Sequence, residues 1–340
     1  MISICRYTQN KQTEWDDFIK VSKNGTFLFL RSYMDYHSDR FQDHSLMFYN
    51  EKNRLIAVLP ANIKTASTLT PKLSTLNSKP STLNSQPSTL HSHQGLTYGG
   101  FVLSPEIHIS EVGELFRLTI SYLKENGFCE WNYKQIPYIY HLIPSQEEDY
   151  WLWQYNATLK ACNMMTARDF KSIINSVSSS RKRTYFNKLN RQGYTVAIDD
   201  NIRNFWPILE ENLMERFCSR PVHSLSEIEL LKQRFPDNIV CCTVKNPDGK
   251  TIAGTLLFIT QQVVRTQYIS ASHEGKHTNA LDYLMLSLIR HYGQNPQYRY
   301  FEFGTSMAED GIHLNEGLIL QKEGFGGRAV ACKIYSINIQ

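Results

Sequence analysis

Apolar side chains recur at helical spacing in two long stretches of the second half of the chain. The first stretch covers residues 202–217, where they are Phe205, Ile208, Leu209, Leu213 and Met214. The second covers residues 279–292, with Gly293 placed to end it and with one apolar face made of Leu281, Leu284, Met285 and Leu288. Side chains three and four residues apart share one face of a helix, so both stretches predict amphipathic helices.

Three runs rich in β-branched and aromatic residues lie between these helices: NIVCCTVK, TIAGTLLFIT and VVRTQYISAS. The turn NPDGK joins the first two, and Pro-Asp-Gly between β-prone runs is typical of a hairpin. Further elements are a basic helix over residues 178–191, a strand over 194–198, a helix capped by Ser224, and the strands RYFEFG and AVACKIYSI around a short helix in NEGLILQKEGFG.

The first half of the chain shows a similar order. A strand near ISICRY precedes a helix that carries Trp15, Phe18 and Ile19, and a second helix follows around RSYMDYHSDRF. Three strands come next, in SLMFYN, RLIAVLPANI and LTYGGFVL, and then the helix VGELFRLTISYLKENG, the strand CEWNYKQI, a helix near DYWLWQYN and a strand near TLKACN. Each half therefore predicts strand, two helices, three antiparallel strands, helix, strand, helix, strand.

A seven-residue repeat interrupts the first half. Residues 67–94 read STLTPKL, STLNSKP, STLNSQP and STLHSHQ. A coiled coil needs apolar a and d positions and good helix formers, whereas these copies are rich in Ser, Thr, Asn and Pro. We predict an extended or disordered surface insertion at residues 65–92, and a ligand-binding or glycosylated tract is the alternative.

The chain length of 340 residues suits two domains, predicted at residues 1–165 and 166–340. The net charge of +4 does not indicate the concentrated basic face of a DNA-binding protein. The start of the chain has no apolar signal segment, and no run approaches the ~18 apolar residues of a spanning helix, so we expect a cytoplasmic location. The seven scattered cysteines predict reduced thiols, with a cysteine nucleophile as the alternative, and no metal-ligand spacing is present.

Five stretches carry a family resemblance: SHQGLTYGG, ERFCSRPVHS, YISASHEGKHTNALDYLMLSLI, FEFGTS and LNEGLILQKEGFGG. With the order of elements, they resemble the GCN5-related N-acetyltransferase (GNAT) fold used twice, as in Fem-type peptidoglycan aminoacyltransferases and FemAB-like proteins of polysaccharide loci. The resemblance implies an α/β (α+β) fold of two tandem GNAT-like domains, each a mixed, mostly antiparallel sheet flanked by helices. It also implies a donor cleft where the fourth and fifth strands of the second domain diverge.

The resemblance implies that the fourth strand binds an acyl donor, acetyl-CoA or another acyl-CoA, through Tyr268, Ser270 and Ala271. Simple acetyltransferases hold the pyrophosphate of coenzyme A with a glycine-rich loop, but the loop here is HEGKHTN, with one glycine. Gly275 would allow close approach of the backbone, Lys276 would add a positive charge, and Asn279 would start a helix whose N-terminus favours an anion. Glu274 opposes that charge.

Three residues are candidates for catalysis. Glu302 follows Phe301 on the fifth strand, so alternation places it at the cleft or on a polar face, as a base or water anchor. His273 is a candidate base, or else an exposed loop histidine. Lys322 matches the lysine of the Fem-type motif, where a cation near the acyl carbonyl or donor phosphate is implied, although Gln321 stands where an aromatic is common.

Candidate residues for the acceptor come from both halves. Arg216 and His223 flank a loop where this fold closes over the acceptor, and an arginine fork suits a diphosphate or carboxylate. Arg181 belongs to a basic run that would steer an anion, and the alternative for each arginine is a solvated helix residue. His93 and Tyr98, with the glycines beside them, would shape an acceptor groove between the halves or form a simple bulge.

Three hypotheses about function follow. The first is an N-acyltransferase that moves an acetyl or acyl group from acyl-CoA to an amino group of a sugar nucleotide or surface-polysaccharide precursor. The second is a Fem-like aminoacyltransferase that uses aminoacyl-tRNA on a peptidoglycan precursor; a long coiled-coil arm for tRNA is not visible. The third is a non-catalytic tandem fold that binds a glycan or a protein.

Overall fold

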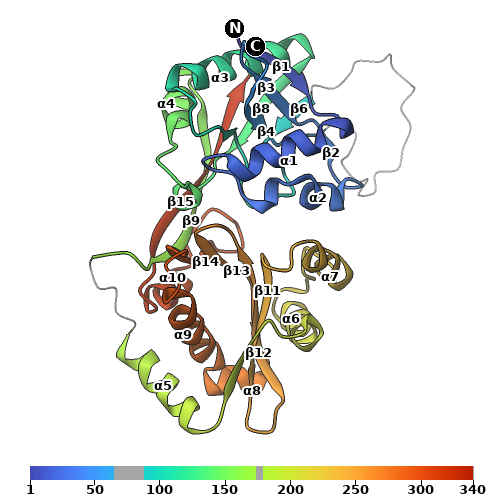
Figure 1. The fold of residues 1–340 in the computed structure, drawn as a ribbon. Helices are drawn as coiled ribbons and strands as arrows, with labels where there is room; N and C mark the ends of the chain where they lie inside the picture. Colours follow the sequence, from blue (N-terminus) through green and yellow to red (C-terminus); the bar gives the residue numbers. More distant parts are fainter. Residues whose placement is uncertain (65–87, 174–178, 340) are drawn as a thin grey trace, which may run out of the picture. The chain divides into compact units, whose positions relative to one another are not determined.

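The computed structural model describes residues 1–64, 88–173 and 179–339 and divides into two compact units (Figure 1). The first unit contains Met1–Cys162 and Cys332–Gln340, and the second contains Asn163–Ala331. We predicted a boundary between residues 165 and 166, with the end of the chain in the second domain. The last residues instead join the first unit because strand β15 (Arg328–Asn338) pairs there, with Ile334 opposite Lys134 and Asn338 opposite Glu130.

Two sheets form the first unit. The antiparallel sheet has the order β1-β3-β4-β7, made of β1 (Ser3–Arg6), β3 (Leu46–Tyr49), β4 (Leu55–Leu59) and β7 (Val102–Leu103). The mixed sheet continues from β15 in the order β8-β6-β5-β2, made of β8 (Phe128–Lys134), β6 (Ser88–His91), β5 (Asn62–Lys64) and β2 (Gln42–Asp43). Phe101, Phe116 and Trp131 are fully buried in the core between the helices and these strands.

The helices of the first unit follow its apolar spacing. Trp15, Phe18 and Ile19 are buried on one face of α1, as predicted. The helix predicted over residues 31–41 is shorter, because the chain turns into a 3-10 helix after Met34. The α-helices are α1 (Gln12–Val21), α2 (Arg31–Met34), α3 (Ile109–Glu125) and α4 (Glu147–Gln154), and the 3-10 helices cover Gln9–Lys11, Phe27–Phe29, Asp35–His37 and Tyr138–Tyr140.

The end of the repeat forms part of the core. Most of the predicted insertion lies outside the described residues, but the fourth copy, STLH, forms strand β6. Leu90 is fully buried there, and β6 pairs with both β5 and β8. The prediction of a surface insertion was therefore wrong for residues 88–92. The stretch LTYGGFVL, predicted as the fourth strand, contributes only Val102 and Leu103 to a sheet, because β6 already occupies that place.

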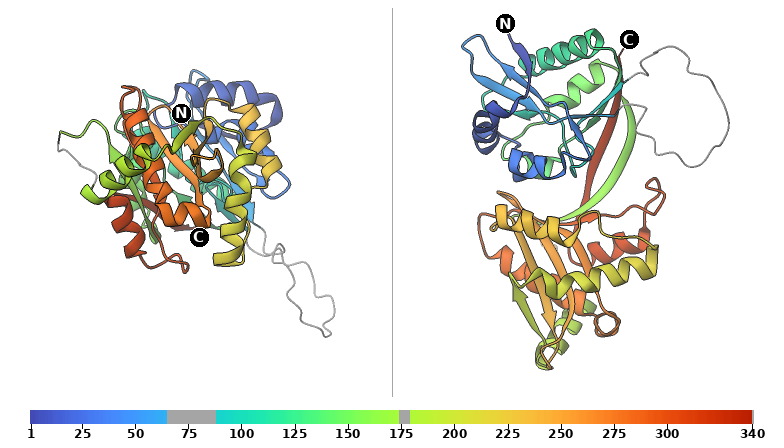
Figure 2. Two further views of the ribbon diagram at one scale, coloured as in Figure 1. Left: turned by 90° about the horizontal axis from the view of Figure 1, so that it is seen from below. Right: turned by 90° about the vertical axis from the view of Figure 1, so that its right-hand side faces the viewer.

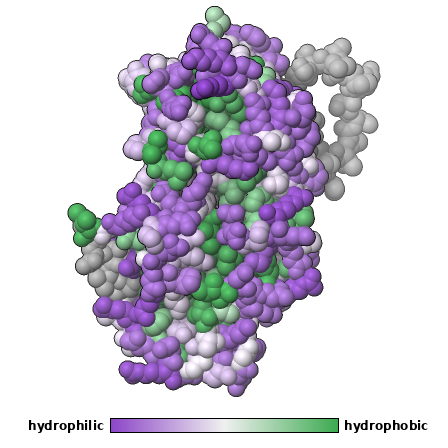
Figure 3. All heavy atoms as spheres, in the orientation of Figure 1, coloured by the Kyte–Doolittle hydropathy of each residue, from purple (hydrophilic) through white to green (hydrophobic). Residues whose placement is uncertain are grey.

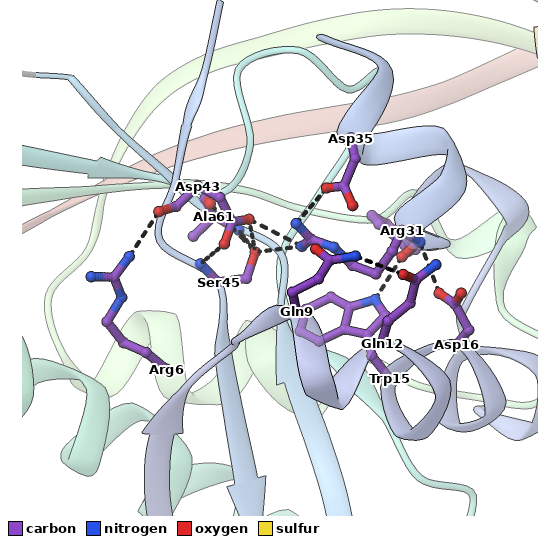
Figure 4. A network of polar contacts seen from close by, with 11 residues as sticks. Arg6, Gln9, Gln12, Trp15, Asp16, Arg31, Asp35, Asp43, Ser45 and Ala61 are labelled. Carbon is purple, nitrogen blue, oxygen red and sulfur yellow. Dashed lines mark hydrogen bonds and ion pairs between the residues drawn. The ribbon is translucent and has the colours of Figure 1, made fainter. Parts of the chain in front are cut away.

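A buried arginine organises the polar interior of the first unit (Figure 4). Arg31 pairs with Asp35 at 2.5 Å and with Asp43 at 3.0 Å, and its guanidinium carbon lies 3.9 Å from the centre of the Tyr7 ring. Burying a charged group costs folding free energy unless partners replace the water around it. The two carboxylates and the Tyr7 ring are these partners for Arg31.

The second unit has one mixed sheet with helices on both faces. The strand order is β10-β11-β12-β13-β14-β9, made of β9 (Thr158–Asp169), β10 (Thr195–Ile198), β11 (Ile239–Lys245), β12 (Thr251–Ile259), β13 (Val263–Ala271) and β14 (Tyr300–Thr305). The helices are α5 (Ser180–Arg191), α6 (Ile202–Phe217), α7 (Leu225–Arg234), α8 (His273–Thr278), α9 (Ala280–Gly293) and α10 (Glu316–Glu323). Helices α6 and α7 cover one face of the sheet, and α9 covers the other (Figures 1 and 2).

These observations agree with the predicted mixed α/β class and with two consecutive units of related element order. No helix within the described residues is both long and apolar enough to cross a membrane.

Candidate active site

Strands β13 and β14 separate partway along their length. They pair in parallel only at Val263–Tyr300, Val264–Phe301 and Arg265–Glu302. Strand β13 continues to Ala271, six residues past the last pair, so the described part of the chain places no strand against that edge. The opening that the resemblance implied beside these strands is present.

Backbone alternation decides which residues of β13 face the opening. The N–H of Ser272 donates to the carbonyl of Ile252 on β12 at 2.9 Å. Ser270 and Tyr268 lie two and four residues before Ser272, so their main-chain groups also point toward β12. Successive residues of a strand point their N–H and C=O groups to opposite edges, so Ile269 and Ala271 direct theirs into the opening. Of the three residues predicted to bind the donor, Ala271 lies at this edge, whereas the main chain of Tyr268 and Ser270 is used within the sheet. Ile269 was not among the predicted residues.

The side chain of Tyr268 contacts His223. The Tyr268 hydroxyl lies 2.6 Å from His223 Nδ1, and the two rings meet edge to face. Trp206 packs against the same tyrosine, and burial raises the pKa of Tyr268 to about 12. His223 is buried and does not line the pocket described next, so the structure pairs a predicted donor residue with a predicted acceptor residue.

A pocket of about 320 Å³ occupies the opening. Strand β13 contributes Ile269, Ser270 and Ala271 to its wall. The other lining residues come from α6, α8, α9, β14 and the α10 region: Asn212, Arg216, Lys276, Leu281, Met285, Phe303, Leu318, Gln321, Lys322 and Phe325. Hydrophobic residues gather along the middle of this face of the second unit, between hydrophilic margins (Figure 3).

The charges of the pocket lining are all positive. Arg216, Lys276 and Lys322 line it, and no aspartate or glutamate in the part of the chain that the structure describes does so. Within the described residues, Arg216 and Lys276 have no carboxylate within ion-pair distance, and both side chains are exposed. Unpaired cations beside an apolar wall favour a ligand that has an anionic part and an apolar part.

Lys322 is a buried cation at the end of β14. Its ammonium group donates to the carbonyls of Gly304 at 2.9 Å and Thr305 at 2.5 Å, and to Ser306 Oγ at 2.9 Å. Burial lowers the pKa of Lys322 to about 8, against the opposing effect of the Glu302 charge. All three of its protons have acceptors in the chain, so its ammonium group has no proton left for another hydrogen bond.

Glu302 lies in the interior, which corrects its predicted place at the cleft or on a polar face. It has no exposed surface, and its carboxylate pairs with Arg265 at 2.6 Å and accepts the Gly304 N–H at 2.5 Å. Phe301 and Phe303 are buried as well. Both faces of β14 are covered, so the alternation argument was wrong for this strand.

The predicted phosphate loop is a helix. Ser272 caps α8 by accepting the Gly275 N–H at 3.2 Å, which removes that N–H from ligand binding. A Cβ atom on Gly275 would lie 2.2 Å from the Ile252 carbonyl oxygen, so this glycine permits close packing on β12. His273 is exposed, meets the His277 ring edge to face, and does not line the pocket. Asn279 adopts a left-handed conformation between α8 and α9 and makes no side-chain cap.

The other predicted acceptor residues do not line the pocket. Arg181 is exposed on α5, with its guanidinium 5.8 Å from the Tyr185 ring centre. In the first unit, His93 is buried and stacks on His37, and the buried Tyr98 hydroxyl donates to Thr26 Oγ1 at 3.2 Å. These two residues follow β6 in a loop, not on a strand. A Cβ on neighbouring Gly99 would lie 2.2 Å from the Ser92 oxygen, so chain packing explains that glycine.

Comparisons with known proteins agree with this geometry. Residues 178–310 match the family model described as an acetyltransferase (GNAT) domain. The second unit therefore contains a GNAT acetyltransferase domain, and the protein is an acyltransferase. No curated protein sequence matches the chain.

The fold of this acyltransferase is similar to several tandem-unit structures. FemX superposes with a TM-score of 0.68 at 12% identity, over 99% of this chain and 97% of that one. L-PGS from Bacillus licheniformis has a TM-score of 0.58 at 11% identity, over 96% and 91% of the two chains. A tandem GNAT protein from the clavulanic acid biosynthesis pathway has a TM-score of 0.52 at 10% identity, over 100% and 99%.

Two residues that line the pocket of the acyltransferase were missed from sequence, Ile269 and Asn212. Asn212 lines the pocket one helical turn before Arg216, and its Oδ1 is buried without a partner among the described residues. The i, i+4 spacing of Asn212 and Arg216 could have indicated that the two residues share one face of α6. The described residues contain no group of three or more His, Cys, Asp or Glu side chains able to hold a metal ion.

Proposed function

We propose that the acyltransferase moves an acetyl or other small acyl group from an acyl-CoA to an amino group, at the pocket of the second unit. The observation that carries this proposal is the opening after Arg265–Glu302, where Ile269 and Ala271 present main-chain groups within a pocket of about 320 Å³. The amides of a pantetheine chain would pair with these groups as an added strand. Lys276 and the start of α9 would attract the donor's phosphates.

Lys322 supports the chemical step by its charge. The amine nitrogen attacks the acyl carbonyl carbon, the new C–N bond forms, the C–S bond breaks, and the amine proton ends on the departing sulfur or in water. A buried cation at the end of β14 would stabilise the negative oxygen of the tetrahedral intermediate. Neither Glu302 nor His273 is given a role as base, because the first is engaged by Arg265 and the second lies outside the pocket.

The proposed acceptor is an amino sugar carried by a nucleotide or another surface-polysaccharide precursor. Arg216 lines the pocket and has no carboxylate partner among the described residues, so it suits a phosphate or diphosphate of such a molecule. This acceptor class places the reaction in the cytoplasm, where fractionation of cells that make the protein would find it.

A second candidate is transfer of an aminoacyl group from tRNA. Two observations favour it: Ser272 occupies the Gly275 N–H that a coenzyme A loop would offer, and the fold is similar to FemX and L-PGS. An aminoacyl ester is also an activated carbonyl on an anionic carrier, so the same opening and cations would serve it.

Isothermal titration calorimetry with acetyl-CoA and, separately, with aminoacyl-tRNA tests these proposals. We expect saturable heat with acetyl-CoA and transfer of labelled acetate to an amino-sugar nucleotide. Heat with aminoacyl-tRNA alone would favour the second candidate. Binding of neither donor would overturn both and leave a non-catalytic role. Gly275→Asp is unsuited to this test because any Cβ there meets β12.

A further inference from the structure

Phe325 forms a fixed wall of the pocket. Its ring is almost fully buried and stacks on Phe303, with 5.6 Å between ring centres and 18° between planes. Its carbonyl accepts from Arg168 Nη1 at 2.8 Å, and its N–H donates to the carbonyl of Lys322 at 3.0 Å. Neither the ring nor the backbone of Phe325 can move without breaking these contacts.

Lys182 contacts the same ring. Its ammonium nitrogen lies 3.7 Å from the centre of the Phe325 ring and 2.8 Å from Asp282 Oδ1 in the first turn of α9. The Lys182 side chain is 10% exposed and that of Asp282 is 15% exposed, so water screens the contacts little. The same lysine therefore connects Phe325 to the helix that supplies Leu281 to the pocket.

The place of Phe325 at the narrow end of the opening follows from strand pairing. The two strands are paired up to Arg265–Glu302, so the opening is narrowest beside Phe303, the next residue of β14. The wide end lies near Ala271 and Lys276, where a charged carrier would bind. A donor that lies along β13 with its phosphates at the wide end brings its acyl group to Phe303 and Phe325.

We propose that Phe325 limits the size of the transferred acyl group and that Lys182 is a positioning residue that holds its ring in place. The inference rests on the proposed acyl-CoA function and deepens it, since it assigns short acyl groups as the substrate class. One member of the basic run on α5 thus has a defined structural role, because Lys182 shares a helix face with Phe186 and Leu189, whereas Arg181 is exposed.

Acyl-chain selectivity tests the role of Phe325. The measurement is kcat/KM for acetyl-, propionyl-, butyryl- and hexanoyl-CoA with one amine acceptor. We expect the wild type to lose about 10-fold or more between acetyl and butyryl, and Phe325→Ala to raise the butyryl-to-acetyl ratio by about 10-fold or more. Phe325→Leu is the milder variant should the alanine variant not fold, and Leu320→Ala, at a position 67% exposed on α10, is the control.

The same ratio tests Lys182. We expect Lys182→Met to raise the butyryl-to-acetyl ratio several-fold because the ring loses its support, and Lys182→Arg to restore the wild-type ratio. Lys188→Met removes an exposed lysine of the same helix and should leave the ratio unchanged. A purely structural loss would lower kcat/KM for all four donors by the same factor, which would contradict the positioning role.

The outcomes separate this inference from the proposed function. Acetyl transfer with an unchanged ratio in Phe325→Ala and Phe325→Leu overturns the inference and leaves the acyl-CoA function standing. Absence of calorimetric binding for every acyl-CoA overturns the donor and the inference together. A raised butyryl-to-acetyl ratio in the Phe325 variants, together with the wild-type ratio in Lys182→Met, would overturn the positioning role of Lys182 and leave the role of Phe325 standing.

Discussion

The two units each contain a parallel strand pair, and only one pair is open. In the first unit, β6 is paired with β8 along its whole length, from Ser88–Phe128 to His91–Asn132, and the next N–H also donates to Asn132. In the second unit, three residues of β13 pair with β14 and the rest diverge. A sheet that satisfies its own main-chain groups has none to offer a ligand, so similar element order does not imply a second donor site of this kind.

The charged and titratable side chains also differ between the two units. In the first unit Arg31 is neutralised by two carboxylates, and five histidines have pKa values lowered by burial: His37, His44, His91, His93 and His141. In the second unit, cations line a pocket to which no carboxylate of the described residues contributes. The first unit thus pairs its buried arginine with carboxylates, and the second has cations at a pocket.

The largest expected effect is acid unfolding of the first unit before the second. The pKa is lowered from 6.5 to about 4 for His44, His91 and His141. The unfolded chain takes up these protons near pH 6.5 and the folded unit does not, so the free energy of unfolding falls as the pH drops from 6.5 toward 4. Tryptophan fluorescence during acid titration measures this.

The tryptophans separate the two transitions. Trp206 is in the second unit, and the other four are in the first: Trp15, Trp131, Trp151 and Trp153. A Trp206→Phe variant should keep the acid transition of the wild type. Replacement of the exposed His273 and His277 by glutamine should not move it. Unfolding of the second unit at a higher pH than the first unit would contradict the prediction.

The next effect concerns one lysine of each unit, Lys322 and Lys134. Lys322→Met should lower kcat by about 100-fold or more, because the cation near the reacting carbonyl is lost. Lys134 in the first unit is the matched control: it is half-buried, its pKa is lowered by desolvation, and it donates to the Leu96 carbonyl at 2.6 Å. Lys134→Met should weaken the first unit while calorimetry shows unchanged donor affinity.

The pKa of Lys322 adds a pH test. With a pKa of about 8, the side chain loses its charge above that pH, so kcat should fall on the alkaline side. Lys322→Arg keeps the charge to much higher pH and should extend the active range upward in whatever activity it retains. An unchanged alkaline limb in the arginine variant would argue against a charged Lys322 in the reaction.

A smaller effect, on the free energy of unfolding, is expected for strand β6, which the last copy of the repeat forms. Leu90→Ala should lower the free energy of unfolding of the first unit by about 2–5 kcal/mol, because the side chain is fully buried in its core. Thr89→Ala, at the half-buried position before it, should cost less than about 1 kcal/mol. Urea unfolding followed by tryptophan fluorescence provides both values, and equal costs would show that β6 is not part of the core.

The smallest effect is electrostatic. Lys276→Gln should weaken acetyl-CoA binding by about 2- to 5-fold at low salt and by less at high salt, since exposed charges are screened. Lys250→Gln changes an exposed lysine of the β11–β12 turn and is the control. An effect of Lys276→Gln that is independent of salt would argue against a phosphate contact.

Much of the second unit was predictable from local pattern. The helices with Leu209 and Leu284 on their apolar faces, the Pro-Asp-Gly hairpin and the strand ending in FEFG are all present. Arg216, Ser270, Ala271, Lys276 and Lys322 line the pocket as residues of the predicted site, although their roles remain predictions. Periodicity and turn residues report the burial of one face of an element, and these elements each have such a face.

The failures occurred where a neighbouring segment decided the outcome. Ser272 turned the predicted loop into α8, and β14 is covered on both faces, which buried Glu302. The last copy of a polar repeat became a strand because β5 and β8 offered two edges to it. Local sequence carries little information about such partners.

The sequence by itself determined the order of elements, the family resemblance and several of the residues that line the pocket, because apolar spacing and motif residues are local properties. Only the tertiary structure decided that Ile269 and Ala271 face the opening, that Glu302 pairs with Arg265, and that Lys182 supports Phe325. Strand register and contacts between distant segments set those facts, and neither is encoded in the spacing of residues along one element.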